Sequence, residues 1–489
     1  MLPHLVMLYY RLPYILYRDY PDFGYLTDNR NFGYDTACKS CVKVGDRVLS
    51  KTGSFFYSVL TDVPQSEDAI AQKLARLFVG VTADEIVADV GEFFQELVRD
   101  GFVGCGQGEI TCPVYFSYAD RSPKTLQNER EEKLPDEEGF YEKWGQNYHL
   151  SRVHLEVSAP CNERCVHCYF PEFYRKGVMP RELFLRILEQ CKECDVLSIT
   201  ISGGEPMLNP DLLFFIKECR ENNFSINLLS NLTLLSDEML QEFIKTPLLS
   251  IQTSLYSMNA EVHDLITTVK GSFEKTKRAI ETLYKHNIPM QINCPIMKQN
   301  KETYQDVLEW ARGKNIEADS DYMLFGCFNG SCENLKCRLD LSELEPFIVK
   351  ELESGENKEK ENNDKGRRDY TICPVCISSV CISHTGIVYP CEGWQSHSLG
   401  NIQDVSLKQI WEESADVKEL RSLSYDDFPK CRVCSDRAFC SICLIRNANE
   451  SKSGDFRQVN PYYCEIARKK HALTRKRTAT SKEGAAKCD

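Results

Sequence analysis

The sequence has no excess of positive charge and no long, uninterrupted run of hydrophobic residues. Of its 489 residues, 59 are Lys or Arg and 72 are Asp or Glu, which gives a formal net charge of -13. Nucleic-acid-binding proteins normally present a basic face, so we expect no nucleic-acid partner. Residues 1–16, "MLPHLVMLYYRLPYIL", are apolar but lack the basic start and the small-residue cleavage site of a signal peptide. Pro3, Arg11 and Pro13 interrupt this stretch, which argues against a membrane span and a membrane partner.

Cysteine, in contrast, is abundant, with 24 in the chain. In a secreted protein such a number indicates disulfides, whereas in a reducing compartment it indicates metal binding. Because we recognise no signal peptide, we predict a cytoplasmic protein whose cysteines bind metal. The length allows roughly two to four domains, each large enough to bury a hydrophobic core without disulfides.

Three of the cysteines, Cys161, Cys165 and Cys168, lie within eight positions in "CNERCVHC". Three thiols cannot pair off into disulfides, and they are one short of the four thiolates that a four-iron cluster normally takes. The motif therefore predicts a cluster with one iron free to bind another ligand, and a structural zinc loop is the alternative. The motif follows a predicted strand, and reactive residues of α/β barrels lie at the C-terminal ends of strands.

Strands and helices alternate between residues 149 and 325. Helical patterns at 181–193 and 272–286 lie between short, β-branched runs. Six such repeats predict an α/β fold with parallel strands, a partial (β/α)6 TIM-like barrel. The predicted strands are 152–158, 196–202, 225–230, 248–255, 289–296 and 318–325.

The N-terminal part of the chain predicts a separate domain. "CVKVGDRVLSKTG" predicts a hairpin, and the apolar spacing after Thr82 predicts a helix with a Thr82–Glu85 capping box that ends near Gly101. Strands followed by helices in so few residues indicate a winged-helix domain. We predict these divisions: an extension (1–30), the winged-helix domain (31–115), a charged linker (116–148), the barrel (149–325), a bridging region (326–372), a cysteine-dense domain (373–465) and a disordered basic tail (466–489).

The Cys-x3-Cys-x2-Cys spacing, followed by Tyr169, resembles the radical S-adenosylmethionine (SAM) superfamily, and His167 stands where that family usually has an aromatic residue. The family's segment for the SAM amino group resembles "SGGEP" at 202–206, although such a segment alone is most often a turn. The resemblance implies that SAM fills the open iron position, accepts an electron and yields a 5′-deoxyadenosyl radical. It implies SAM contacts at Gly203, Gly204, Glu205 and Pro206.

Looser matches add three polar residues. Ser230 and Asn231, in "LLSNLTLL", stand where the family often has Thr-Asn-Gly. Ser254, in "QTSLYSMNAEVHD", resembles a serine that would face the SAM ribose or carboxylate. Each of these residues could instead cap a strand end. An arginine often follows the family's His-Asp pair, but this chain has Leu265-Ile266-Thr267-Thr268 there, so that contact does not carry over.

The C-terminal cysteines resemble the SPASM extension of radical SAM enzymes, which carries auxiliary four-iron clusters. Gly386 and Cys391 match the family's Gly-x4-Cys pattern. The resemblance implies one cluster on Cys373, Cys391 and Cys443 with either Cys376 or Cys381, and another on Cys431, Cys434, Cys440 and Cys464. The Cys440–Cys443 spacing is one residue shorter than the commonest version, and zinc ribbons are the alternative. We expect free thiols at Cys38, Cys41, Cys191, Cys194, Cys327, Cys332 and Cys337.

Residues 31–104 resemble the RiPP recognition element, a winged-helix domain that binds the leader of a ribosomally made precursor peptide. A DNA reader would need a basic recognition helix, whereas this helix reads "DEIVADVGEFFQEL". The resemblance implies that the leader adds as a strand to a sheet edge and tethers the core peptide near the barrel.

Together these resemblances imply a radical SAM/SPASM peptide maturase with three [4Fe-4S] clusters and SAM. We expect it to form a thioether crosslink from cysteine sulfur to carbon, using a low-potential electron donor such as ferredoxin or flavodoxin. Alternatives within enzymes are carbon–carbon or ether crosslinking, epimerisation, and formylglycine formation as in anaerobic sulfatase maturases. The non-enzyme alternative is a zinc-bound winged-helix regulator.

Overall fold

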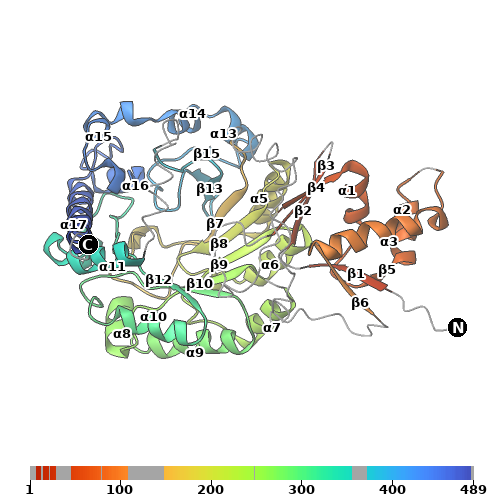
Figure 1. Ribbon diagram of the computed structural model, residues 1–489, viewed down its shortest axis with the longest axis horizontal. Coiled ribbons are helices and arrows are strands. Elements are labelled where there is room, and N and C mark those ends of the chain that lie inside the picture. The colour runs from red at the N-terminus through yellow and green to blue at the C-terminus, as the bar shows by residue number, and fades with distance from the viewer. Residues whose placement is uncertain are drawn as a thin grey trace.

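The computed structural model describes residues 7–12, 15–20, 23–28, 46–78, 80–107, 148–246, 248–354 and 372–485. They form an N-terminal domain, a central α/β domain and a C-terminal domain that extends the central sheet (Figure 1). All but the last residue of the predicted linker lies outside the described residues, as do Cys38, Cys41 and Cys488. In the described ranges, no helix has both the length and the apolar character that a membrane crossing requires.

In its described residues, the N-terminal domain contains two three-stranded antiparallel sheets and three helices. The first five residues of the predicted hairpin lie outside the described residues, and its second part forms β4, which is followed directly by α1. Ser50 caps the first turn of α1 by accepting a hydrogen bond from the Gly53 N–H at 3.1 Å. The predicted extension is wrong, because β1, β2 and β3 belong to these sheets. The sheets have the orders β5-β1-β6 and β2-β3-β4. The elements are β1 (Met7–Arg11), β2 (Ile15–Asp19), β3 (Phe23–Asp28), β4 (Asp46–Ser50), α1 (Lys51–Ser58), β5 (Gln65–Ser66), α2 (Glu67–Ala75), α3 (Ala83–Arg99) and β6 (Val103–Gln107).

Helix α3 begins and ends where its sequence predicts. The Thr82 N–H and hydroxyl both donate to the Glu85 carboxylate at 2.8 Å, so the capping box is confirmed. The apolar side of the helix is buried, with Phe94 stacked on Tyr9 of β1 at a ring distance of 5.4 Å. Gly101, at φ +86, takes the left-handed conformation that turns the chain towards β6.

The central sheet has nine strands in the order β12-β11-β10-β9-β8-β7-β13-β14-β15. Strands β7 to β12 pair in parallel with their neighbours, and helices cross between them (Figure 1). All six predicted barrel strands are present, although the last is much shorter than predicted. Their bounds are β7 (Arg152–Ser158), β8 (Ser198–Gly203), β9 (Ser225–Leu229), β10 (Ser250–Ser254), β11 (Met290–Asn293) and β12 (Glu317–Asp319). The helices are α5 (Arg181–Glu193), α6 (Leu212–Glu221), α7 (Asp237–Lys245), α8 (Ala260–Thr267), α9 (Ser272–Lys285) and α10 (Tyr304–Gly313).

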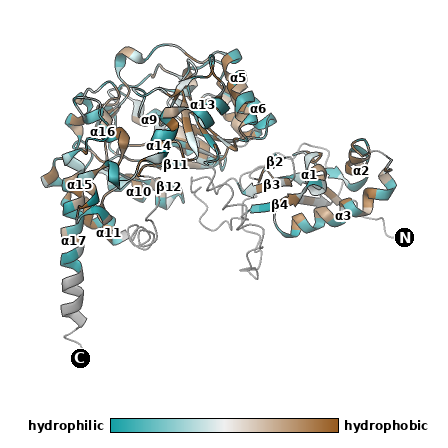
Figure 2. Ribbon diagram, turned by 90° about the horizontal axis from the view of Figure 1, so that it is seen from above, coloured by the Kyte–Doolittle hydropathy of each residue, from teal (hydrophilic) through white to brown (hydrophobic). Residues whose placement is uncertain are grey.

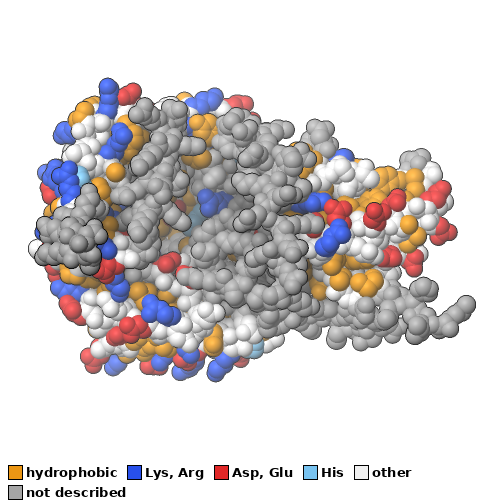
Figure 3. Space-filling model, in the orientation of Figure 1, with side chains coloured by type: hydrophobic (Ala, Val, Ile, Leu, Met, Phe, Trp, Pro, Cys, Tyr) orange, Lys and Arg blue, Asp and Glu red, His pale blue; other side chains and the backbone are white. Residues whose placement is uncertain are grey.

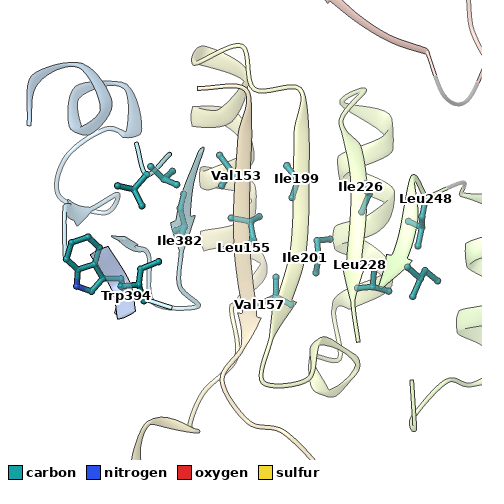
Figure 4. Close-up of a cluster of buried hydrophobic side chains, with 14 of the residues drawn as sticks. Val153, Leu155, Val157, Ile199, Ile201, Ile226, Leu228, Leu248, Ile382 and Trp394 are labelled. Atoms are coloured by element: carbon teal, nitrogen blue, oxygen red, sulfur yellow. The ribbon is translucent and has the colours of Figure 1, made fainter. Parts of the chain in front are cut away.

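Alternate residues of the barrel strands face opposite sides of the sheet. Val153, Leu155 and Val157 of β7 are fully buried and pack with apolar side chains of β8 and β9 (Figure 4). Burying one such side chain contributes about 1.5–3 kcal/mol. Because side chains alternate along a strand, His154 and Glu156 point to the other side, and His154 hydrogen-bonds Ser202 of β8 there. The interior of the barrel is therefore polar.

The C-terminal domain continues the sheet beyond β7. Strand β13 (Ser379–Ile382) pairs in parallel with β7, and β14 (Ile387–Tyr389) and β15 (Gly400–Asn401) follow antiparallel. The predicted disordered tail is wrong for its described part, because α17 runs from Pro461 to Ala485. The other helices here are α11 (Glu345–Ser354), α13 (Leu407–Glu413), α14 (Ala415–Ser422), α15 (Pro429–Arg432) and α16 (Leu444–Glu450).

The N-terminal domain contacts the barrel at the edge where the strands begin. The Arg18 guanidinium donates to Val196 O at 2.6 Å and to Asn223 O at 2.8 Å. The Asn223 amide in turn donates to Tyr17 O at 2.7 Å. Because these barrel residues precede β8 and β9, the contact lies at the N-terminal strand edge, opposite to the cysteine motif. A small apolar cluster completes it: Leu16, Tyr20, Tyr25 and Leu197.

Candidate active site and metal centres

The three-cysteine loop directly follows β7, at the C-terminal edge of the barrel, and all three thiols are half-buried. Two backbone hydrogen bonds fix the loop to the end of α8. The Arg164 N–H donates to Thr267 O at 3.0 Å, and the Val166 N–H donates to Ile266 O at 2.9 Å. The segment that lacks the family's arginine therefore holds the cysteine loop through its backbone.

The cysteine side chains lie in a low-polarity environment with one cation beside them. Burial raises the pKa of Cys161 to about 11 and the pKa of Cys165 well above its usual value. A metal ligand must be a thiolate, so cation or metal charge must offset this burial. The Arg175 guanidinium donates to Cys168 Sγ at 3.1 Å and to Phe170 O at 3.0 Å, and its side chain is only 6% exposed.

Tyr256 contacts the same loop from the end of β10. Its hydroxyl lies 3.7 Å from Cys165 Sγ and 3.0 Å from His167 Nε2, and Ser254 is another hydrogen-bond partner of this phenol. Tyr169, in contrast, turns away and stacks on Phe325 at a ring distance of 5.1 Å. The structure thus brings Ser254 and His167 together through Tyr256.

The two glycines of "SGGEP" allow close contact between two backbone segments. A Cβ on Gly203, which has φ +141, would lie 2.0 Å from Ser158 O. A Cβ on Gly204 would lie 2.4 Å from both Ala159 O and Pro160 O. The missing side chains therefore let the end of β8 pack on the chain that leads into the cysteine loop, and the implied SAM contacts of these glycines stay a prediction.

Glu205 is fully buried at the centre of a hydrogen-bond network. Its carboxylate accepts from the Ser230 hydroxyl, the Asn231 N–H and the Met207 N–H at 2.8, 2.8 and 3.0 Å. Burial raises its pKa to about 6, although these donors oppose the shift. Pro206 begins the short helix η4 (Pro206–Leu208) that follows.

Asn231 links this network to the cysteine loop. Its side-chain amide donates to Asn162 Oδ1 at 2.9 Å and lies 3.9 Å from Cys161 Sγ. Three separate segments, the cysteine loop, "SGGEP" and the end of β9, therefore meet at one place. Such a place offers thiolates, a carboxylate and amide groups to a polar ligand.

The barrel interior carries a second polar group that the sequence did not reveal. Burial and the nearby Glu392 raise the pKa of Glu156 to about 8, and Gln395 donates a hydrogen bond to it. Burial, then Glu156 and Glu392, also raise the pKa of Tyr169. Glu156 of β7 and Glu392 of the C-terminal domain therefore lie near each other, and both are close to Tyr169 and Cys381.

The first C-terminal cysteine set comes together around Cys443. Burial raises the pKa of Cys373 and Cys391, Glu392 adds to the shift of Cys391, and the nearby Cys443 adds to both shifts. The two candidates for the fourth position differ in their surroundings. Cys376 interacts with Cys373 and belongs to the same hydrophobic core, whereas Cys381 interacts with Cys391 and with the carboxyl groups of the barrel interior.

The second C-terminal set lines a cavity of about 270 Å³ near the surface. Within the described ranges, no three His, Cys, Asp or Glu side chains are close enough to hold one metal ion together, so these thiols surround a wider space. Burial raises the pKa of Cys440 to about 11, and the neighbouring cysteines of the set add to this shift. The set consists of Cys431, Cys434, Cys440 and Cys464.

No described cysteine is in a disulfide, and the free-thiol role expected of Cys191, Cys194, Cys327, Cys332 and Cys337 stays a prediction. Cys327 nevertheless lies against the cysteine loop, with its Sγ 3.7 Å from Cys168 O.

Comparison with known proteins assigns families to three segments of the chain. The radical SAM superfamily model matches residues 155–311, and the SPASM model, an iron-sulfur cluster-binding domain, matches residues 373–435. A model of coenzyme PQQ synthesis protein D (PqqD) matches residues 46–103. This chain is a radical SAM/SPASM enzyme. Its domains imply SAM binding and [4Fe-4S] clusters.

The relatives of this radical SAM/SPASM enzyme differ in chemistry. It is 25% identical over 332 residues to the AdoMet-dependent heme synthase of Methanosarcina barkeri, a match that covers 63% of this chain and 94% of that protein. It is 26% identical over 332 residues to the PqqA peptide cyclase of Gluconobacter oxydans, covering 64% and 91%. The crystal structure of Streptococcus suis SuiB bound to precursor peptide SuiA shares its fold, with TM-score 0.56, 16% identity and coverage of 93% and 99%.

Two residues that contact the loop of this radical SAM/SPASM enzyme were not foreseen from sequence. Tyr256 lies inside "QTSLYSMNAEVHD", so its position beside a matched serine was the available signal. Arg175 had no signal, because its contact with Cys168 depends on how the turn at 171–175 folds back.

Proposed function

We propose that this radical SAM/SPASM enzyme modifies a ribosomally made precursor peptide. The observation that carries the proposal is the combination, in one chain, of the thiol-and-carboxylate site at one barrel edge with a PqqD-type domain at the opposite edge. The heme synthase match leaves more than a third of this chain uncovered, so chemistry on a small molecule would leave the additional domain without a role. A peptide substrate gives it one, because a leader can be held apart from the reacting core.

The cysteine loop and the Glu205 network would hold the cosubstrate. Cys161, Cys165 and Cys168 would bind three irons of a four-iron cluster and leave the fourth open. When bound, the cluster and SAM supply a 5′-deoxyadenosyl radical that removes a hydrogen atom from the peptide. The Glu205 carboxylate would accept the SAM ammonium group, while the Ser230 hydroxyl and the Asn231 N–H orient that carboxylate.

Other residues of the site would position the Glu205 carboxylate and contact SAM. Gly203 and Gly204 keep the carboxylate close to the cysteine loop, and Pro206 starts the turn behind it. Ser254 would face the ribose or carboxylate of SAM, and its contact with Tyr256 couples it to His167. Tyr169 closes the side towards the C-terminal domain.

The two C-terminal cysteine sets would carry auxiliary clusters, which gives three in all. The first would use Cys373, Cys391, Cys443 and either Cys376 or Cys381. The second would use the four cysteines that line the cavity. Since many thiols must stay reduced, we place the enzyme in the cytoplasm.

We propose thioether formation, from a cysteine sulfur to a carbon of the peptide, as the reaction. The first auxiliary set lies beside the polar barrel interior, so a cluster there could take up the electron released on ring closure or bind the peptide thiolate. The electron for each cycle would come from a low-potential carrier such as ferredoxin or flavodoxin.

The leader would bind to the N-terminal domain by strand addition. Among the described residues, β4 pairs only with β3, and it lies beside the end of α3, where Arg47 forms ion pairs with Glu96 and Asp100. This edge offers backbone groups for a further strand. The N-terminal domain lies at the edge where the barrel strands begin, and the cysteine loop lies at the edge where they end. The peptide must therefore extend along the length of the barrel, which is about 20 Å for a six-residue strand.

The test is anaerobic incubation with SAM, dithionite and the short cysteine-rich peptide encoded next to the gene. We expect 5′-deoxyadenosine and a peptide lighter by about two hydrogens, with fragmentation blocked between a cysteine and its partner residue. The Cys168→Ala variant is the matched control and should give neither product. A lighter peptide that fragments as a linear chain would contradict crosslinking, and deoxyadenosine without any peptide change would contradict this substrate.

A further inference from the structure

The second C-terminal cysteine set lies close to the surface. Cys434 is exposed, and the neighbouring Val433 is 82% exposed, which is unusual for a large apolar side chain. The cavity that the four thiols line is open to this surface and also includes Lys430, Arg437 and Arg468. Whatever the thiols hold is therefore within reach of a partner protein.

Cations surround this part of the molecule. Lys430, Arg432, Arg437 and Arg468 are all exposed, and Figure 3 shows Lys and Arg side chains gathered on the left flank, where Figure 1 places α15 and α17. Some are offset locally, since Arg432 pairs with Asp426 at 3.0 Å. Arg468 pairs with Glu465 in the same way.

Helix α17 extends the basic surface outward from the thiols. It contains Cys464, and residues 466–477 hold six Lys or Arg and no Asp or Glu. Its inner part is fixed, because His471 stacks on Phe439 at 4.8 Å and hydrogen-bonds Asp436. Arg475, Lys476 and Arg477 further along are exposed, and Figure 2 shows α17 at the edge of the molecule beside α15.

This local charge is opposite to that of the whole chain, whose net charge is -13. An acidic partner is therefore repelled by the molecule in general and attracted to this surface. An exposed apolar side chain within a charged rim is the usual anatomy of a transient protein interface. The surface, defined as Lys430, Val433, Arg437, Arg468, Arg475 and Lys476, has these properties.

We infer that this surface docks an acidic one-electron carrier protein directly above the second cysteine set. The inference rests on the proposed function, because it takes the thiols to hold an iron–sulfur cluster. An electron carrier fits better than other acidic partners, because α17 contains Cys464 of the set and its Arg468 lines the same cavity as the four thiols. Docking there brings the carrier's redox group close to the thiols.

The test measures binding of a purified acidic flavodoxin to the cluster-loaded enzyme at low and high salt. For Arg475→Glu/Lys476→Glu we expect binding weaker by about tenfold at low salt and a smaller dependence on salt. The control Lys275→Glu/Arg278→Glu makes the same charge change on exposed positions of α9 and should bind as the wild type does. Arg437 lies near the thiols, so the iron content of Arg437→Glu is measured first to show that the second cysteine set is intact. This variant should then bind flavodoxin more weakly, as the α17 variant does.

Equal binding by the α17 variant and the wild type would overturn the inference, as would an equal loss in the α9 control. Weaker binding of the precursor peptide, with flavodoxin binding unchanged, would also overturn it and assign the surface to the substrate. A failure of the proposed function would be distinguished from a failure of this inference, because the wild type would then not modify the peptide even with dithionite as reductant. With dithionite as reductant, we expect the α17 variant to be as active as the wild type.

Discussion

Replacing Gly203 by alanine should separate the Glu205 segment from the cysteine loop. The added Cβ would lie 2.0 Å from Ser158 O and 2.9 Å from Ser158 N, and both atoms belong to backbone. A non-glycine residue at φ +141 costs about 1–3 kcal/mol, and forced displacement of a packed neighbour costs about 1–3 kcal/mol more. We therefore expect the free energy of unfolding to fall by about 4 kcal/mol.

The assay is thermal unfolding of the anaerobically loaded enzyme, followed by circular dichroism. For a domain of 150–250 residues, a loss of about 4 kcal/mol lowers Tm by about 8–16 °C. Deoxyadenosine formation should fall by about 100-fold, because Glu205 moves relative to the loop. Gly313→Ala is the control, since a Cβ there meets nothing within 4 Å, and it should be as stable as the wild type. A Gly203→Ala enzyme with wild-type Tm would refute the close approach of the two segments.

Three further predictions concern charge and ligands. Burial holds the pKa of Glu205 at about 6, so Glu205 loses its negative charge as the pH falls through this value. The affinity for SAM, measured by equilibrium dialysis, should therefore drop below pH 6 in the wild type. In Glu205→Gln the affinity for SAM should vary little with pH. Arg175→Gln removes a cation from beside Cys168 Sγ, which destabilises the reduced state of the loop's cluster relative to its oxidised state. A loss of about 1.4 kcal/mol in the reduced state would lower the midpoint potential by about 60 mV. Lys176→Gln, with no contact to a sulfur, should leave the electron paramagnetic resonance titration unchanged. The iron content of Cys376→Ala should be lower than that of the wild type by about four irons per chain, whereas Cys381→Ala should keep the wild-type iron content. The reason is that Cys376, unlike Cys381, belongs to the same hydrophobic core as the other cysteines of the first set. Loss of iron in Cys381→Ala alone would make Cys381 the fourth ligand.

Much of the fold and of the loop site follows from local patterns in the sequence. The six barrel strands alternate with amphipathic helices, so period and order were enough to predict them. The Thr82–Glu85 capping box is also a local signal, because both partners lie in one turn. The convergence of the cysteine loop with Glu205 was predictable because parallel strands end at the same edge.

The rest depends on contacts between distant parts of the chain. Strand β13 pairs with β7 across more than 200 positions, and no pattern within its four residues names that partner. Strands β1 to β3 were missed because short aromatic runs separated by prolines look like an irregular extension. Helix α17 was missed because its charge suggested a solvated tail, whereas its Tyr463 hydroxyl donates to Leu324 O and its His471 stacks on Phe439.

The central claim is that the thiolates of the three-cysteine loop hold a cluster that splits SAM. The most direct measurement is the yield of 5′-deoxyadenosine from SAM and dithionite, compared between the wild type and Cys161→Ala, Cys165→Ala and Cys168→Ala. The wild type should form it, and each variant should form none while both C-terminal sets keep their iron. Undiminished yield from any of the three variants would contradict the claim, as would no yield from a fully iron-loaded wild type.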